Sequence, residues 1–351
     1  MSSGTADQVI GARFAARVAE REAELLSPRA ARSYPAVRRH EEEPCSLRTP
    51  FQRDRDRIVH SKAFRRLMHK TQVFVAPLGD HYRTRLTHTL EVTAISRTVA
   101  RALGLNEDLT EAVGVGHDLG HPPFAHIGEE VLDACLKERF GPGYHFHHNE
   151  HSLRVVDHIE RDGAGLNLTE PVRDGIVGHS SRAPLPVTLE GRIVRVMDRV
   201  AYINHDIDDA LRAGILRERD LPAEPIAALG PTGSTRIDAL VHDMVEHSEA
   251  AGDITQGEEA EAAMLRLREF MFERIYLGEE VTRERARIER VIRRLFEHYA
   301  GRPQLLGLGR NGTEVADSEL AQAVIDYVAG MTDRFCIAAF TELEVPHAFA
   351  L

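Results

Sequence analysis

The chain has 351 residues, of which 42% are hydrophobic and 28% are charged, and its formal net charge is −11. This length and balance exclude a wholly disordered chain and allow a substantial buried core, while the lack of any run of about eighteen apolar residues excludes a membrane-spanning helix. The N-terminus lacks a basic-then-apolar leader, and the three cysteines are too widely spaced for a disulfide framework, so we expect a cytoplasmic protein.

Helical periodicity accounts for most of the chain. The predicted helices span residues 7–26, 86–103, 188–213, 258–299 and 314–341. Further helix starts are predicted at Asn106, which precedes two acidic residues, and at Thr169, which precedes Glu-Pro. Strand-like alternation is scarce, and Thr71–Ala76 is the best short candidate. The connector over 27–50 is rich in Pro, Arg and Glu, so we expect it on the surface.

These elements predict an all-α protein in which a central helical bundle is followed by additional C-terminal helices. We divide the chain into an N-terminal helix and connector over 1–47, a core with the most informative motifs over 48–213, and a C-terminal helical region over 214–351. Whether this last region is a separate domain or continues the core stays open.

Positive charge and histidine are concentrated in one part of an acidic chain. Of the 19 histidines, 14 lie between His60 and His205, and residues 48–85 contain ten Lys/Arg against three Asp/Glu. A general nucleic-acid binder needs a broad positive surface, which a chain of this net charge does not provide. The pattern instead favours one small anionic ligand held by a local cluster of cations.

The densest motif is GHDLGHPPFAHIGE over Gly116–Glu129. His117 and Asp118 stand where a helical pattern ends, so one cation can be reached by both a nitrogen and an oxygen. His88 lies in the apolar-striped helix upstream, and Asp198 lies on an apolar helix where an unpaired carboxylate is costly to bury. Two imidazoles and two carboxylates form a site suited to a divalent metal ion such as Mn, Mg, Co, Fe or Ni.

Ordinary structural roles compete with this metal site. A His-Asp dipeptide occurs by chance in many sequences, and Asp198 has potential ion-pair partners in Arg195 and Arg199. The joint pattern of four residues on three segments, rather than the dipeptide, carries the metal hypothesis.

Several ordered blocks resemble one known family. They are RTPFQRDRDRIVHSKAFRRLMHKTQVF, RTRLTHTLEV, HDLGHPPFAHIGE, FHHNEHSLRVV and RIVRVMDRVAYINHDIDDA, all within residues 48–213, with a weaker echo in GMTDRF at 330–335. Together they resemble the HD-domain phosphohydrolases, and within that superfamily the deoxynucleoside triphosphate triphosphohydrolases of the dGTPase-like group.

The resemblance implies an HD-domain helical bundle that hydrolyses a deoxynucleoside triphosphate (dNTP) to a deoxynucleoside and inorganic triphosphate with a divalent metal. The residues that match the family's metal ligands are His88, His117, Asp118 and Asp198. Those that match its catalytic groups are His126, Glu129 and His148, and those that match its substrate-binding positions are Gln72, Arg85, Tyr202 and Asp206. Two departures, His151 for an expected glutamine and Ala125 for a frequent glycine, leave the preferred base open.

Residue spacing agrees with several of these roles. His126 and Glu129 are three residues apart and share a helix face, so the carboxylate can orient the imidazole, which either activates water or protonates the leaving group. A glutamate in a first helical turn also simply complements the helix dipole. Because the guanidinium fork suits phosphate, we expect Arg66 and Arg85 in the site and the other basic residues on a solvated or intersubunit face.

Asp198, Tyr202 and Asp206 recur every four residues and therefore line one helix face. Tyr202 can pack against the deoxyribose and leave no room for a ribose 2′-OH, while Asp206 and Gln72 can bind the 3′-OH. Core packing is the competing role for Tyr202.

Two other functions stay open. One is a different HD-family nucleotide phosphohydrolase, and the other is a nucleotide-sensing or single-stranded nucleic-acid-binding regulator, although no aromatic-interleaved stacking pattern is present. The expected partner is a dNTP substrate, and the resemblance implies a homo-oligomer. The lack of a long apolar run predicts that there is no membrane contact. Whether a dNTP is also an allosteric effector, and whether single-stranded nucleic acid binds, the sequence leaves undecided.

Overall fold

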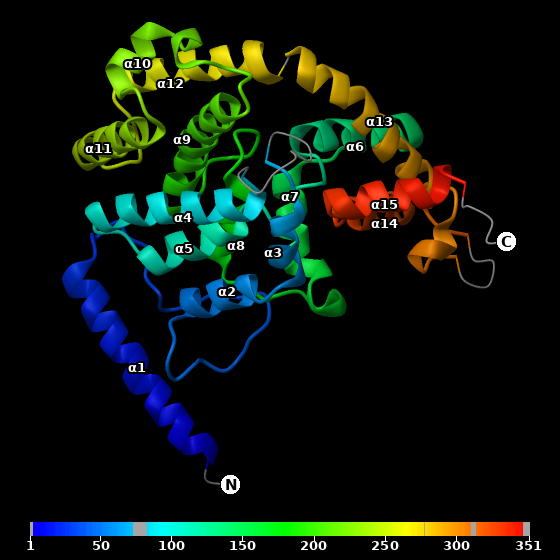
Figure 1. Ribbon diagram of the computed structural model, residues 1–351. Coiled ribbons are helices and arrows are strands. Elements are labelled where there is room, and N and C mark those ends of the chain that lie inside the picture. The colour runs from blue at the N-terminus through cyan, green and yellow to red at the C-terminus, as the bar shows by residue number, and fades with distance from the viewer. Residues whose placement is uncertain (1–2, 73–82, 277, 310–313, 347–351) are drawn as a thin grey trace, which may run out of the picture.

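The computed structural model describes residues 3–72, 83–276, 278–309 and 314–346. Across these ranges the regular secondary structure consists of fifteen α-helices and short 3₁₀ or π-helical turns, without a β-strand (Figure 1). The predicted all-α fold is therefore confirmed. Thr71, in the predicted strand, forms only an isolated bridge with Thr84, and residues 73–76 of that prediction lie outside the described residues. In the described parts of the chain, no helix combines the length and apolarity needed to cross a bilayer.

The helices, in chain order, are α1 (Ser3–Leu25), α2 (Pro50–Val59), α3 (Lys62–Arg66), α4 (Arg85–Ala102), α5 (Glu107–Gly116), α6 (Ala125–Phe140), α7 (His148–Arg154), α8 (Glu170–Gly178), α9 (Leu189–Arg212), α10 (Ala223–Leu229), α11 (Gly233–Ala251), α12 (Glu258–Met271), α13 (Glu279–Ala300), α14 (Asp317–Ala329) and α15 (Asp333–Glu344).

The two predicted helix starts follow from residues at or next to each start. Asn106 caps α5, because its side-chain oxygen accepts hydrogen bonds from the backbone amides of Asp108 and Leu109. Thr169 precedes α8, whose first turn contains proline, where the missing amide hydrogen has no helical partner to lose.

Two long helical predictions are interrupted in the structure. The stretch over 258–299 divides into α12 and α13, separated by a π-helical turn over Phe272–Tyr276. The stretch over 314–341 divides into α14 and α15, because Thr332 caps a new helix by accepting a hydrogen bond from the amide of Phe335. Periodicity continues through both breaks, so the sequence pattern did not reveal them.

Helix α9 runs through the centre of the molecule, with α4, α5 and α8 on one side and α11 and α12 on another (Figure 1). Its Ile193 and Met197 belong to one apolar cluster with α11 and α12, while its Val194 and Ala201 belong to a second with α2, α5 and α8. Because both faces are covered, polar side chains along α9 are drawn into the interior, and this placement creates the site described below.

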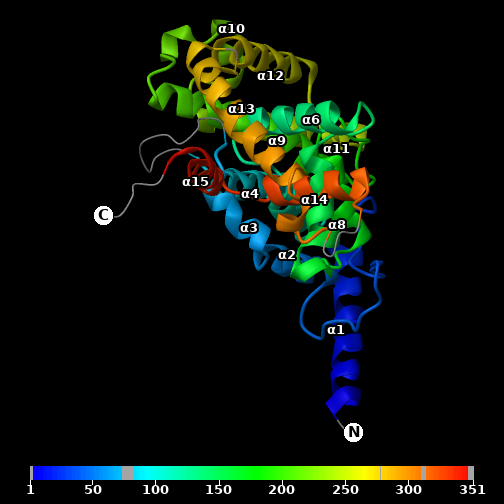
Figure 2. The ribbon, with the colours of Figure 1, turned by 90° about the vertical axis from the view of Figure 1, so that its right-hand side faces the viewer.

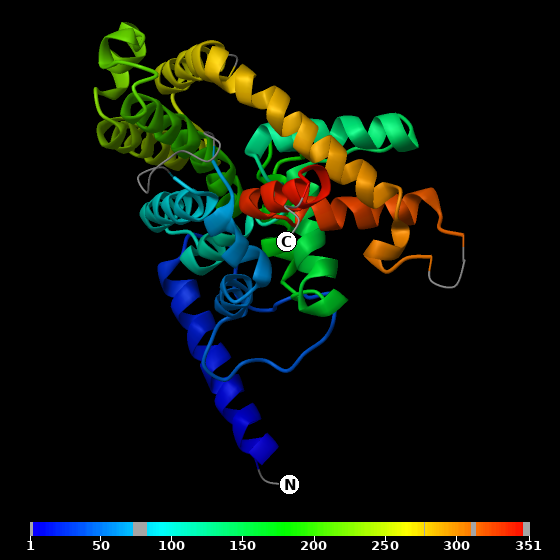
Figure 3. The ribbon, with the colours of Figure 1, turned by 45° about the vertical axis from the view of Figure 1, so that its right-hand side comes forward.

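The C-terminal region closes one side of the bundle. Helix α13 packs against α6, α14 and α15 (Figure 3). Ile292 and Leu295 of α13 form a third apolar cluster with Leu132 of α6 and Val324 of α14. The C-terminal region therefore shares buried surface with the helix that carries His126 and Glu129, although the exact division between core and C-terminal region stays a prediction.

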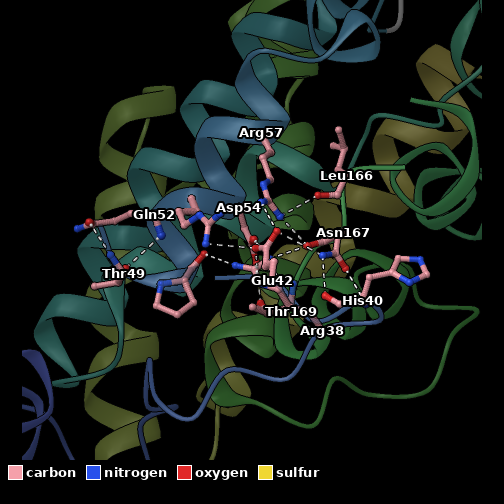
Figure 4. Close-up of polar contacts among 12 residues, drawn as sticks. Arg38, His40, Glu42, Thr49, Gln52, Asp54, Arg57, Leu166, Asn167 and Thr169 are labelled. Carbon is pink, nitrogen blue, oxygen red and sulfur yellow. Dashed lines mark hydrogen bonds and ion pairs between the residues drawn. The ribbon is translucent and has the colours of Figure 1, made fainter. Parts of the chain in front are cut away.

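Helix α1 extends away from the body, with the N-terminus at its far end (Figure 2). The connector after it is fixed to the core by a buried ion pair in which Arg38 Nη1 lies 2.5 Å from Asp54 Oδ1 (Figure 4). Asp54 also accepts hydrogen bonds from the amide and hydroxyl of Thr169, at 2.8 and 2.7 Å. These contacts join the connector, α2 and α8.

Candidate active site

The four predicted metal ligands meet between α4, α5 and α9. His88 Nε2 lies 3.0 Å from Asp198 Oδ1, and His117 Nε2 lies 3.6 Å from Asp118 Oδ2 and 3.7 Å from Asp198 Oδ1. Ligand atoms of His88, His117 and Asp118 all lie within 4.8 Å of one another. Tertiary packing thus brings together residues that are up to 110 positions apart.

The protonation of His117 suits a metal ligand. Its Nδ1 is 2.7 Å from the carbonyl oxygen of Gly114 and donates to it, which leaves the lone pair on Nε2. That Nε2 is buried and forms no hydrogen bond with any described residue. A buried acceptor without a donor is unfavourable by itself, so an electrophile such as a metal ion fits this position.

The two carboxylates are held in their charged forms. Burial raises the pKa of Asp118, but the positive charge of Arg85, whose Nη1 is 2.7 Å from Asp118 Oδ2, outweighs it and keeps the pKa well below its usual range. Burial likewise raises the pKa of Asp198, and its hydrogen bond with His88 more than reverses the effect. Two ionised carboxylates and two imidazoles form a donor set that fits a divalent cation.

The turn after His117 is shaped by α7. A Cβ added to Gly120 would lie 2.1 Å from the amide nitrogen of Ser152, so only glycine permits this close approach. Ser152 fixes the contact on both sides, because its hydroxyl accepts from the Gly120 amide at 2.9 Å and donates to the His117 carbonyl at 2.8 Å. His151 Nδ1 donates to the Gly120 carbonyl at 3.0 Å, so this departure from the family pattern supports the backbone of the turn.

Glu129 and His148 form a second, adjacent part of the site. Glu129 Oε2 lies 2.9 Å from His148 Nδ1, and Oε1 accepts the His148 backbone amide at 3.2 Å. The other ring nitrogen of His148 lies 3.1 Å from Nε2 of His179. His179 in turn donates from Nδ1 to the carbonyl of Ile176 at 2.7 Å.

These contacts determine the charge of His148. Because His179 uses its Nδ1 proton on a carbonyl, its Nε2 can only accept, and His148 must donate to it. His148 then donates from both nitrogens and is an imidazolium facing the Glu129 carboxylate. The pKa directions agree: burial lowers the pKa of His179 to about 3, whereas the hydrogen bond to Glu129 overcomes burial and raises the pKa of His148.

His126 lies at the rim of this pair. Its side chain is 66% exposed, and its Nδ1 is 3.9 Å from Glu129 Oε2, longer than a hydrogen bond. His121 lies deeper and stacks on His148 with ring centroids 4.5 Å apart. Ligand atoms of Asp118, His121 and His148 lie within 4.8 Å of one another, so the two parts of the site are contiguous.

Two predicted substrate contacts on α9 have partners from the C-terminal region. Asp206 is buried, and the hydroxyl of Tyr276 donates to its Oδ2. Burial raises the pKa of Asp206 to about 7. Tyr202 is half-buried, and its hydroxyl accepts from Arg268 Nε at 3.3 Å. Tyr202 and Asp206 both lie on α9, and both contact the segment that contains Arg268 and Tyr276, as expected for residues on one helix face.

The remaining predicted substrate residues differ in their surroundings. Gln72 is buried, and its Oε1 has no hydrogen-bond partner among the described residues. Arg85 is buried against Asp118, and its Nε is also without such a partner. Arg66 is exposed and donates to the carbonyl of Gly330 at 3.1 Å, so the structure does not bring it to the metal ligands.

Several residues of the site were not singled out from the sequence. Tyr276 and Arg268 reach it from the C-terminal region, and Arg182 Nη1 lies 3.4 Å from Glu129 Oε1. A sequence pattern could have indicated His179, because it follows a glycine at a helix end just as His117 does. In the structure both histidines donate from Nδ1 to a carbonyl three residues earlier. The three others carry no local signal.

Comparison with known proteins agrees with this geometry. Residues 85–203 match the HD domain, and residues 254–342 match the phosphohydrolase-associated domain. The helical bundle with its His, His-Asp and Asp set is thus an HD-domain phosphohydrolase.

Similar curated proteins define the family more closely. The chain is 50% identical to a protein from Caldanaerobacter subterraneus subsp. tengcongensis, with 93% of this chain and 94% of that protein covered. It is 49% identical to one from Clostridium perfringens, with 87% and 90% covered, and 45% identical to one from Desulfatibacillum aliphaticivorans, with 93% and 97% covered. All three are named deoxyguanosinetriphosphate triphosphohydrolase-like protein, and the chain belongs to this family.

A crystal structure of a hypothetical protein from Aquifex aeolicus is also similar, at 20% identity and a TM-score of 0.45, with 82% of this chain and 69% of that chain covered. This likeness is too distant to inform the chemistry.

Proposed function

We propose that this protein hydrolyses deoxynucleoside triphosphates to a deoxynucleoside and inorganic triphosphate. The observation that carries the proposal is the adjacency of two largely buried groups: the His88, His117, Asp118 and Asp198 set, and the Glu129–His148–His179 chain. The relatives' names point to the same class of reaction. The reaction places water on the α-phosphorus, breaks the bond from that phosphorus to the 5′ oxygen, and delivers a proton to the departing oxygen.

The metal ion would be held by His117 Nε2, His88 and the carboxylates of Asp118 and Asp198. When bound, it supplies Lewis-acid polarisation of a phosphate oxygen. Arg85 has a second role beside it, since its guanidinium neutralises Asp118 through Nη1 and offers to the triphosphate an Nε that has no partner among the described residues.

His148 contributes positive charge where negative charge develops on the phosphate. Its imidazolium is fixed by Glu129 on one nitrogen and by His179 on the other, so it needs no reorientation when the substrate reacts. Asp118 and His121 lie beside it, which keeps this charge close to the metal ligands.

His126 handles the proton that must reach the leaving 5′ oxygen. Its exposed position at the rim leaves the ring free to turn toward a bound nucleotide, and Glu129 lies close enough to attract its protonated form. A move of less than about 1 Å converts the 3.9 Å separation into a hydrogen bond.

The α9 face selects the sugar. Tyr202 would pack on the deoxyribose ring and exclude a 2′-OH, and Asp206 with Gln72 would bind the 3′-OH. The buried Oε1 of Gln72 supports this role, because it is an acceptor that has no donor among the described residues.

The test is product identification after chelator-treated protein is reloaded with Mn²⁺, Mg²⁺ or Co²⁺. Each dNTP is supplied alone and in mixtures, with ribonucleotides as controls, and the products are separated by anion-exchange chromatography. We expect equimolar deoxynucleoside and triphosphate, and little turnover of ribonucleotides. Orthophosphate or pyrophosphate as the sole inorganic product would exclude the proposal.

Variants connect this activity to the site. Asp118→Ala removes a metal ligand and the partner of Arg85, so we expect no turnover. The matched control is Asp238→Ala, which removes a carboxylate from the exposed face of α11, where its side chain is 77% exposed. Equal activity in the two variants would show that the reaction takes place elsewhere.

A further inference from the structure

The GMTDRF motif lies at the junction of α14 and α15, far along the chain from the metal ligands. Its Asp333 is buried and accepts three hydrogen bonds from other segments. Oδ2 accepts the Thr71 amide at 2.9 Å and also the Thr71 hydroxyl, while Oδ1 accepts the Phe124 amide at 3.0 Å. One carboxylate of the C-terminal region therefore connects two distant segments, the one that contains Thr71 and the turn at Phe124.

Phe124 belongs to a strained turn. Phe124 and Ala125, the residues at the start of α6, have φ angles of 61° and 55°, in the left-handed region that costs a non-glycine residue about 1–2 kcal/mol. The family resemblance has glycine frequent at position 125. Because α6 starts in this turn, the conformation of the turn sets the direction in which the side chains of His126 and Glu129 point from α6.

A second contact holds the same region. Lys70 is buried, and its Nζ donates to the carbonyls of His121 and Ala329. Its own carbonyl accepts the amide of Arg85 at 3.0 Å. The end of α14 is thereby attached both to the turn that leads to α6 and to the segment that carries Gln72 and Arg85.

From these contacts we infer that Asp333 is a positioning residue for the catalytic pair: it holds the left-handed turn at Phe124–Ala125, and so orients His126 and Glu129 from the C-terminal region. This inference rests on the proposed function for its activity readout. Among the described residues the Asp333 carboxylate accepts hydrogen bonds from Thr71 and Phe124 rather than from a metal ligand, so it acts through the backbone of the turn.

The variants separate positioning from simple loss of stability. Asp333→Ala removes all three hydrogen bonds, and we expect kcat to fall at least tenfold. Thr332→Ala is the matched control, since it removes the cap of the same helix, lowers Tm, and leaves the turn untouched. We expect its kcat to stay within twofold of the unmodified protein.

Two further variants test the cause. Asp333→Asn keeps one oxygen for the Phe124 amide and should lose less activity than the alanine variant. Adding Ala125→Gly to Asp333→Ala should restore at least part of kcat, because glycine adopts the left-handed conformation without strain. Because relief of this strain also stabilises the fold, kcat of both variants is measured well below their Tm, where a gain in stability alone leaves kcat unchanged. If the alanine variant fails to fold, the asparagine variant gives the comparison.

Hydrogen exchange supplies a readout that does not depend on turnover. Amides over residues 120–128 should exchange faster in Asp333→Ala and remain protected in Thr332→Ala. The inference is overturned if that protection is unchanged, or if the two alanine variants lose kcat equally. If the unmodified protein does not hydrolyse dNTPs while the exchange difference persists, the proposed function fails and the positioning contact stands.

Discussion

Replacing Glu129 by glutamine tests the central charge arrangement of the site. Glu129 is buried, and its carboxylate accepts two hydrogen bonds from His148, one from ring Nδ1 at 2.9 Å and one from the backbone amide at 3.2 Å. Glutamine has nearly the same shape but only one accepting oxygen and no charge. His148 then loses the carboxylate that favours its imidazolium form, while His179 still requires a donor.

The size of the effect follows from the bond that is lost. A hydrogen bond to a charged group contributes about 1.5–3 kcal/mol. If that stabilisation is needed in the transition state, its loss lowers kcat about 10- to 150-fold. Because Glu129 raises the pKa of His148, the cationic form of His148 persists to higher pH than usual. Removal of the Glu129 charge should therefore shift the alkaline limb of the kcat–pH profile to lower pH.

The assay is the pH dependence of kcat for dNTP hydrolysis in Glu129→Gln, compared with Glu130→Gln. Glu130 is the next residue of α6, is exposed, and pairs with Arg285 at the surface, so the same substitution there should have no effect. A Glu129→Gln variant with kcat within threefold of the unmodified protein and an unshifted alkaline limb would refute the assigned role of the His148 imidazolium.

Two further predictions concern metal binding and pH. Saturating Mn²⁺ should raise the Tm of chelator-treated protein, since a ligand at about a hundredfold excess over Kd adds about 2.7 kcal/mol to the folded state; differential scanning fluorimetry should show a clearly smaller rise for His117→Ala, and an equal rise would contradict the metal site. Asp206, whose pKa is raised to about 7, keeps a proton in the folded state that the unfolded chain releases near pH 4. Its contribution to stability is therefore present at low pH and falls as pH rises toward 7, by at most about 1.4 kcal/mol per pH unit. Denaturant unfolding between pH 5 and pH 8 should show this decline in the unmodified protein and not in Asp206→Asn, and parallel curves would exclude it.

Local features of the sequence predicted the elements well. Asn106 marked one helix start through its side-chain cap and the Glu-Pro after Thr169 marked another, because both signals depend on neighbouring residues alone. The four-residue recurrence of Asp198, Tyr202 and Asp206 placed them on one face of α9 because helix geometry is regular. The division of the last two helical stretches was missed, since apolar periodicity runs through the breaks.

Taken alone, the sequence determined the helical fold, the family, and the identity of the candidate ligands His88, His117, Asp118 and Asp198, because residue types and motif order record the chemistry that a site requires. Packing alone decided which charges those residues carry. The imidazolium of His148 depends on His179, 31 positions away, and the turn before His126 is hydrogen-bonded to Asp333, 209 positions from Phe124. Such contacts have no local signature, since they arise only when the helices pack and burial makes each hydrogen bond selective.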